Sequence, residues 1–187
     1  RRAACELVKG LSTHYSAEVN GMFSSYVQGM MERYAVNPLE NWKEKDCALY
    51  LVTALAPKQP LGAATGSTLV DIERFFASAI LPELQSEDIN AQPVLKADAI
   101  KFVTTFRVQL PKQVALTLMP HLARFLVSES NVVHSYAALC IEKMLIIKDD
   151  KQLRFNAHDL NPFLSNLLNN LFNALKLPES QENVYVM

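Results

Sequence analysis

The sequence has 187 residues, of which 50% are hydrophobic, and 18 Lys and Arg oppose 19 Asp and Glu to give a formal net charge of -1. A chain of this length and hydrophobic content can bury a sizeable apolar core, which excludes an intrinsically disordered protein. The balanced charge excludes bulk electrostatic attraction to nucleic acid or to a membrane surface.

Apolar residues recur at helical spacing along nearly the whole chain, and no segment sustains the period-two alternation of a half-buried strand. The clearest stripe alternates steps of three and four and contains Val19, Met22, Phe23, Tyr26, Val27, Met30, Met31 and Tyr34. In chain order, this pattern predicts eight helices at 2–14, 17–36, 42–56, 69–86, 93–109, 111–128, 131–148 and 158–176.

Between the third and fourth of these helices, residues 57–68 carry two prolines and two of the five glycines, so this stretch cannot be helical throughout. We interpret it as a loop inserted inside a repeat. Long loops in compact arrays are either binding elements or disordered segments. The sequence leaves both readings open.

Alternate helices resemble one another. A small residue recurs in register at Ala4, Ala48, Ala99 and Ala137, where it lets a neighbouring helix backbone approach closely. The other helices carry a proline flanked by apolar residues at 82, 120 and 162, at intervals of about 40 residues, the period of HEAT and armadillo arrays. We therefore expect an all-α HEAT-repeat (ARM-like) superhelix, with 1–187 forming a single continuous stack of about four repeats.

The sequence contains no motif of reactive groups. Gly62 and Gly66 lack the Lys-Ser or Lys-Thr pair of a phosphate loop, and the histidines are isolated, without HxxxH or HExxH spacing. No nucleophile lies in a Gly-x-Ser-x-Gly turn. We expect no catalytic residue, cofactor or metal site, and thus a binding protein rather than an enzyme.

Basic residues recur on the polar faces expected for the alanine-marked helices. Repeated charges on one helix set of a solenoid form a ladder along a groove, which suits an acidic partner. A solvated face that keeps the array soluble is the alternative, and the sequence does not decide between the two. The candidate partner-binding residues are Lys45, Lys96, Lys101, Arg107 and Lys143.

Cysteine usage and the chain ends give the cellular context. Cys5, Cys47 and Cys140 are far apart and lie among apolar neighbours, which favours a reducing compartment over a disulfide framework. No signal segment or run of 18 apolar residues appears, so we expect no membrane insertion. Because the chain begins with Arg1 and stops within an apolar stretch at 184–187, we expect a central fragment of a longer array, truncated at both ends.

Several segments together carry a family resemblance. Residues 1–11, 42–55, 93–101, 132–138 and 177–183 resemble, in the same order, the exportin-2 (cellular apoptosis susceptibility) family of the karyopherin-beta superfamily. The resemblance implies a nuclear export receptor without enzymatic activity. Its partners would be importin-alpha and GTP-bound Ran, with nucleoporins as a further candidate, and it would shuttle between nucleus and cytoplasm.

A second function remains open at this stage. A static HEAT scaffold subunit without Ran dependence would share the same stacking physics, and fold alone does not separate the two. Dependence of partner capture on the nucleotide bound to Ran is the property that distinguishes them.

Overall fold

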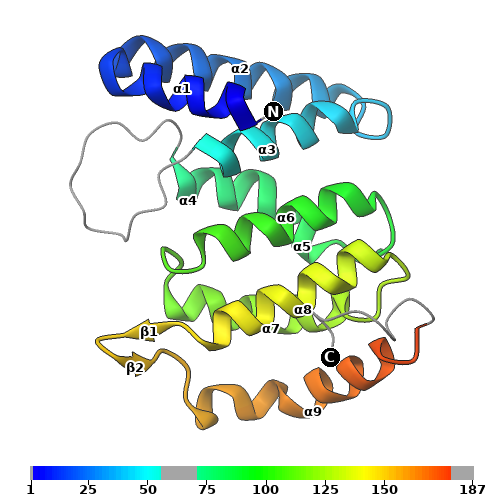
Figure 1. Cartoon of the computed structure of the whole chain (residues 1–187). Helices are drawn as coiled ribbons and strands as arrows, with labels where there is room; N and C mark the ends of the chain where they lie inside the picture. The colour runs from blue at the N-terminus through cyan, green and yellow to red at the C-terminus, as the bar shows by residue number, and fades with distance from the viewer. Residues whose placement is uncertain (1, 56–70, 178–187) are drawn as a thin grey trace. The chain divides into compact units, whose positions relative to one another are not determined.

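The computed structural model describes residues 2–55 and 71–177, and most of these residues lie in helices (Figure 1). The expected all-α class is therefore confirmed. The loop expected at 57–68 lies outside the described residues. The chain divides into two compact units, Arg1–Leu81 and Pro82–Met187. The expectation of one continuous stack stays a prediction.

The first unit contains three long helices, α1 (Arg2–His14), α2 (Ser16–Val36) and α3 (Trp42–Leu55). Helix α2 packs against both α1 and α3. Its buried face consists of Phe23, Val27 and Met30, whereas Met22 and Tyr26 are 60% and 65% exposed. The apolar stripe of this helix is thus wider than the face that it buries.

The helix expected at 69–86 is interrupted. An α-helical turn, α4 (Ile72–Phe75), continues into a π-helical turn, η1 (Phe76–Ile80), and then into α5 (Leu81–Gln85). Within the wide turn, the N–H of Leu81 donates to the carbonyl of Phe76. Pro82 accounts for this widening, because proline has no N–H to donate and its ring crowds the carbonyl four residues earlier.

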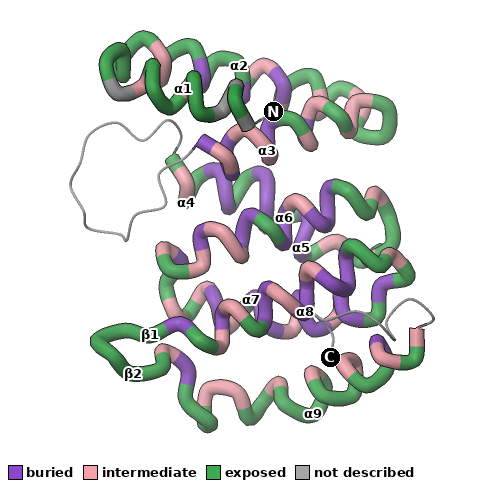
Figure 2. Tube along the Cα trace, in the orientation of Figure 1, coloured by how far each residue is buried: buried purple, intermediate pink, exposed green. Residues whose placement is uncertain are grey.

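The second unit holds α6 (Pro93–Phe106), α7 (Lys112–Phe125), α8 (Asn131–Leu145) and α9 (Ala157–Ala174). Helix α6 packs along α8, and α7 packs against α8 and α9. The alanines that marked the repeat, Ala99 in α6 and Ala137 in α8, are both completely buried, and the two helices are largely buried along their lengths (Figure 2). Close approach of the two backbones requires this burial.

Three helices end earlier than their apolar pattern predicts. Helices α6, α7 and α8 stop at Phe106, Phe125 and Leu145 instead of 109, 128 and 148. Pro111, which precedes α7, keeps Leu110 away from helical backbone and so sets the latest position at which α6 can end. The apolar residues that follow the three ends lie in turns, so their spacing carried no helical information.

Helix α9 begins with a capping box. The Asn156 side chain accepts from the N–H of Asp159 at 3.0 Å, and the Asp159 carboxylate accepts from the N–H of Asn156 at 2.8 Å. Beyond this start, α9 carries two apolar stripes. Leu164, Leu168 and Phe172 form the outer one and are 45%, 42% and 60% exposed.

A short antiparallel hairpin joins α8 to α9, where no strand was expected. Strands β1 (Lys148–Asp149) and β2 (Gln152–Leu153) pair Lys148 with Leu153 and Asp149 with Gln152. The turn residues Asp150 and Lys151 have φ values of 48° and 69°. Strands of this length are too short to show alternation, and the turn lacks the Asn-Gly signal of a tight hairpin.

We expect the Lys151→Gly variant to raise the free energy of unfolding by about 0.5–1 kcal/mol, because glycine adopts positive φ without steric cost. Urea titration of the full chain measures this difference. Lys148→Gly is the matched control and should lower stability by a similar amount, since it places glycine in a strand. Equal shifts in both variants would show that the turn is unstrained in solution.

Candidate functional site

The five basic residues predicted to contact a partner fall into buried and exposed groups. Lys45 in α3 is only 3% exposed, and its Nζ lies 4.8 Å from the centroid of the Tyr34 ring. This is a cation–π distance, and the contact helps to offset the cost of taking the ammonium out of water. The sequence placed Lys45 on the polar face of its helix, and this is wrong because the side chain is buried.

Lys96 is also buried, at 3% exposure. Its Nζ donates to the Glu83 carboxylate at 2.9 Å, and both side chains are at most 9% exposed. The sequence placed Lys96 on the polar face of its helix, and this too is wrong. Lys96 lies between Leu95 and Ala97, which are both buried. The Glu83 carboxylate on α5 offsets the cost of burying the ammonium group of Lys96 there.

Lys101, Lys143 and Arg107 keep access to solvent. Lys101 is exposed on α6, and Lys143 is half-buried on the neighbouring α8, where its Nζ donates to Glu142 at 3.0 Å. Arg107 is half-buried after α6 and donates through Nη1 to the carbonyl of Thr104 at 2.7 Å. The structure thus brings Lys101 and Lys143 onto adjacent helices of one unit. Partner binding by these residues stays a prediction.

One extensively hydrogen-bonded residue of this unit is a residue that the sequence did not single out. Arg154, directly after β2, donates through Nη1 to the carbonyls of Arg107 and Leu110 at 3.3 and 3.0 Å. Its Nη2 donates to the carbonyl of Val108 at 3.3 Å. These are carbonyls of the turn between α6 and α7, so one guanidinium satisfies backbone groups 44 to 47 residues away in the chain.

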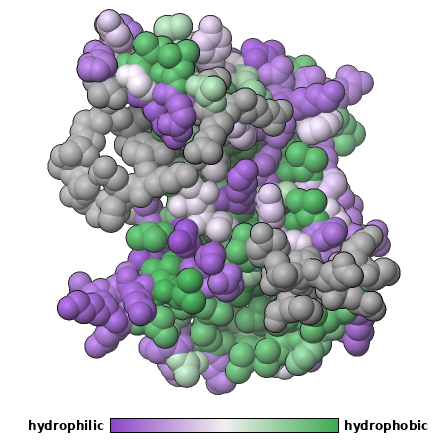
Figure 3. Space-filling model, viewed as in Figure 1, coloured by the Kyte–Doolittle hydropathy of each residue, from purple (hydrophilic) through white to green (hydrophobic). Residues whose placement is uncertain are grey.

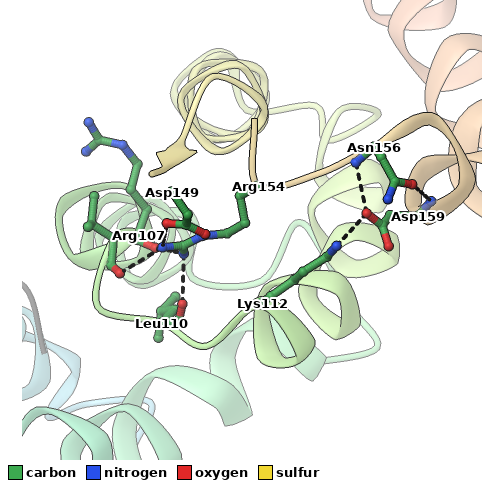
Figure 4. A network of polar contacts seen from close by, with 8 residues as sticks. Arg107, Leu110, Lys112, Asp149, Arg154, Asn156 and Asp159 are labelled. Carbon is green, nitrogen blue, oxygen red and sulfur yellow. Dashed lines mark hydrogen bonds and ion pairs between the residues drawn. The ribbon is translucent and has the colours of Figure 1, made fainter. Parts of the chain in front are cut away.

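The same guanidinium is held from the other side by Asp149. Nε and Nη2 of Arg154 donate to the two carboxylate oxygens of Asp149 at 2.7 and 2.8 Å, a bidentate pair. Figure 4 shows this arrangement, with Arg154 pointing from the hairpin to the turn that follows α6. We call the contacts of Arg154 with Asp149 and with the 107–110 turn the Arg154 cross-tie.

A second ion pair strengthens this end of the unit. Nζ of Lys112, at the start of α7, lies 2.6 Å from the carboxylate of Asp159, the acidic member of the capping box of α9 (Figure 4). Hydrogen bonding to Arg154 is the main cause that lowers the pKa of Asp149. The pKa of Asp159 is lowered mainly by the N–H of Asn156 and next by Lys112. Both carboxylates therefore favour their charged form.

The opposite ends of the helices are joined by hydrogen bonds between neutral groups and by one from an arginine. The Ser128 hydroxyl donates to the side-chain oxygen of Asn90 at 2.9 Å, and the N–H of Glu129 donates to the same oxygen at 3.0 Å. Nδ1 of the buried His134 lies 3.1 Å from the carbonyl of Ser128, which can only accept, so Nδ1 carries the proton. Arg124 adds a hydrogen bond to the carbonyl of Ser86.

These two sets of contacts connect the segments that flank α6 to the segments that flank α8, at both ends of the helices. The loop before α6 is bonded to the loop before α8, and the turn after α6 is bonded to the hairpin after α8. Within the pair α7 and α9, Nδ2 of Asn170 donates to the carbonyl of Ala123 at 2.8 Å. Helices α6 to α9 are thus held together by an apolar seam and by polar contacts at each end.

Among residues 2–55 and 71–177, no cluster of three His, Cys, Asp or Glu side chains could hold a metal ion. Burial raises the pKa of the Cys140 thiol to about 12, so at neutral pH this sulfur is a protonated, poorly nucleophilic group.

No helix in the described part of the chain is long and apolar enough to cross a membrane.

Comparison with known proteins assigns the chain to a family. The Cse1 family model matches residues 1–141, and the model of the CAS/CSE protein C-terminus matches residues 142–187. The chain belongs to the Cse1 family. The resemblance found in the sequence is thereby confirmed.

Relatives within the Cse1 family match along the whole chain. Exportin-2 of Bos taurus and of Homo sapiens are each 47% identical to it over 191 aligned residues, and exportin-2 of Xenopus laevis is 46% identical. The chain spans 20% of the length of these relatives.

A solved structure of the exportin Cse1 in its cargo-free, cytoplasmic state is 33% identical, with a TM-score of 0.74. The match covers 98% of this chain and 19% of that one. At this identity and TM-score the two share a fold, so the expected HEAT-repeat class is confirmed for this member of the Cse1 family.

We expect Lys96→Met to destabilise the full chain by about 3–5 kcal/mol, because it leaves the Glu83 carboxylate buried without its cation. The double variant Glu83→Leu/Lys96→Met should recover most of this loss, since it removes both charges. Urea unfolding measures both. Lys101→Met, the same change at an exposed position of α6, should stay within about 0.5 kcal/mol of the original chain. A double variant no more stable than Lys96→Met would contradict the pairing.

The Arg154 cross-tie should make stability depend on acid. A carboxylate whose folded pKa is lowered stabilises the fold above its unfolded pKa of about 3.9, and this contribution is lost as the pH falls through the folded value. Asp149→Asn should therefore lose less stability than the original chain between neutral pH and about pH 3, measured by urea unfolding at each pH. Arg154→Met should show the same reduced dependence of the free energy of unfolding on pH. An unchanged dependence in both variants would rule out the Asp149–Arg154 pair as the source of the acid sensitivity.

Proposed function

We propose that this chain is a segment of a nuclear export receptor that binds importin-alpha together with GTP-bound Ran and returns importin-alpha from the nucleus to the cytoplasm. The observation that carries the proposal is the match to exportin-2 along the entire chain. The receptor role involves binding alone, with the GTPase chemistry belonging to Ran.

The fold supports this role through linkage between binding sites. A solenoid makes many weak contacts along its length, so a partner that fits one curvature stabilises the binding of another that fits the same curvature. The contacts at both ends of α6–α9 matter here, because a body that resists deformation passes a change of curvature to its neighbours. We propose that bending is concentrated outside α6–α9.

Lys101 and Lys143 are the members of the predicted ladder that this proposal uses for partner contact. They lie on adjacent helices that pack along each other, and both keep solvent access. An acidic partner surface would meet both charges at once. Shuttling through the pore would also bring nucleoporin contacts, which we include as a further proposed partner class.

The test is a chimaera in which these 187 residues replace the matching segment of human exportin-2, used in pull-downs of importin-alpha. We expect capture with Ran loaded with GTP and none with Ran loaded with GDP, as for unmodified human exportin-2 run in parallel. Lys101→Glu/Lys143→Glu in the chimaera should weaken capture, more strongly at low salt.

Each unfavourable result has a distinct meaning. Capture that is equal for both nucleotide states would overturn the export proposal and leave a static HEAT scaffold as the better account. Nucleotide-dependent capture that the double lysine variant does not weaken would retain the export role and remove the ladder from it. Lys176→Glu is the control for nonspecific effects of charge reversal, since Lys176 is exposed after α9, outside the alanine-marked helices.

A further inference from the structure

Three large aliphatic side chains are exposed at the hairpin end of the second unit. Val108, Ile146 and Leu153 are 46%, 55% and 57% exposed. They come from three separate segments, namely the turn after α6, the residue after α8 and strand β2. We call these three residues the hairpin patch.

Hydrogen bonds of Arg154 place the three segments next to one another. Its Nη2 donates to the carbonyl of Val108 at 3.3 Å, and its main-chain N–H donates to the carbonyl of Ile147 at 2.9 Å. These contacts bring the neighbours of Ile146 and Leu153 to the turn that carries Val108. In Figure 3, hydrophobic surface adjoins the hydrophilic projection at the position of the hairpin.

The charges around the patch are mainly positive. Lys148 and Lys151 are exposed on the hairpin, and none of the ion pairs found among the described residues uses them. Asp149 is paired with Arg154 in the cross-tie, which leaves Asp150 as the acidic group of the hairpin outside that pair. A ligand approaching the patch therefore meets Lys148, Lys151 and the half-buried Arg107 against Asp150, while the charge of the exposed Asp149 is balanced by Arg154.

We propose that the hairpin patch is a docking site for an acidic peptide segment that carries large aliphatic or aromatic side chains. The apolar side chains of the segment would cover Val108, Ile146 and Leu153, and its carboxylates would pair with Lys148 and Lys151. Exposed apolar groups edged by charge are typical of interaction sites. Charge complementarity selects an acidic partner over a basic one.

The Arg154 cross-tie makes the site suitable for recognition. It fixes the three segments through hydrogen bonds of a side chain that is only 9% exposed. Binding to a surface that is already ordered costs less conformational entropy than ordering it on contact. The site is independent of the Ran-dependent role proposed above, because its argument uses only the contacts at this end of the unit.

The test uses fluorescence anisotropy with the full chain and a labelled synthetic peptide that alternates glutamate with leucine. Two comparison peptides carry lysine in place of glutamate, or serine in place of leucine. We expect saturable binding of the glutamate–leucine peptide and at least about tenfold weaker binding of both comparison peptides.

Two chain variants locate the site. Ile146→Ser/Leu153→Ser removes the apolar contacts and Lys148→Glu/Lys151→Glu reverses the charges, and each should weaken binding by at least about tenfold. All four positions are exposed, so the fold should be retained, which circular dichroism checks. Leu164→Ser on α9 is the matched control, with a leucine of similar exposure, and should bind as the original chain does.

Four outcomes would overturn the proposal. These are no binding of the glutamate–leucine peptide, equal binding of the lysine peptide, unchanged binding by either double variant, or equal weakening by Leu164→Ser. Sedimentation across a concentration range addresses a second copy of the chain as the occupant. Self-association that disappears in Ile146→Ser/Leu153→Ser would replace the peptide with a second copy.

Discussion

The organisation of the second unit depends on satisfying backbone groups where helices end close to one another. The turn after α6 presents carbonyls that have no partner within a helix, and Arg154 supplies donors to three of them. Without the arginine, these groups would need water at a position where the hairpin and the turn meet. The hairpin, the start of α9 and the turn after α6 therefore form one connected structure.

Apolar packing and polar contacts have separate roles in this unit. The seam between α6 and α8, where Ala99 and Ala137 are completely buried, contributes apolar burial and little directional preference. The ion pairs and hydrogen bonds at the helix ends are directional and fix which turn meets which. Buried polar groups such as Lys96 and Glu83 add to this specificity, since any other arrangement would leave a charge buried without a counter-ion.

Helical periodicity and the recurrence of small residues were enough to predict the all-α class, the helix pairs and the HEAT repeat, because both patterns arise from burial of one helix face. Periodicity could not show that Lys96 is buried, since the decisive partner, Glu83, lies on another helix. Arg154 was missed for a related reason. Its acceptors are backbone carbonyls more than 40 residues away, and because every residue type carries a carbonyl, no sequence pattern marks them. Pro82 was recognised in the sequence as a proline flanked by apolar residues. A kinked α-helix and a π-helical turn can both carry such a proline, so the sequence could not show which one forms.

The position of the strained hairpin turn has a consequence for sequence variation during evolution. Asp149 and Arg154 lie on either side of the Asp150–Lys151 turn, and the cross-tie makes no use of the turn itself. Insertions between the two turn residues would lengthen the projection and leave the cross-tie intact. Loss of Arg154 would remove the selective constraint on Asp149, whereas Arg154 would keep its bonds to the 107–110 turn if Asp149 were lost. Related chains should therefore vary in length at this turn, and an acid at position 149 should occur mainly where the arginine at position 154 is kept.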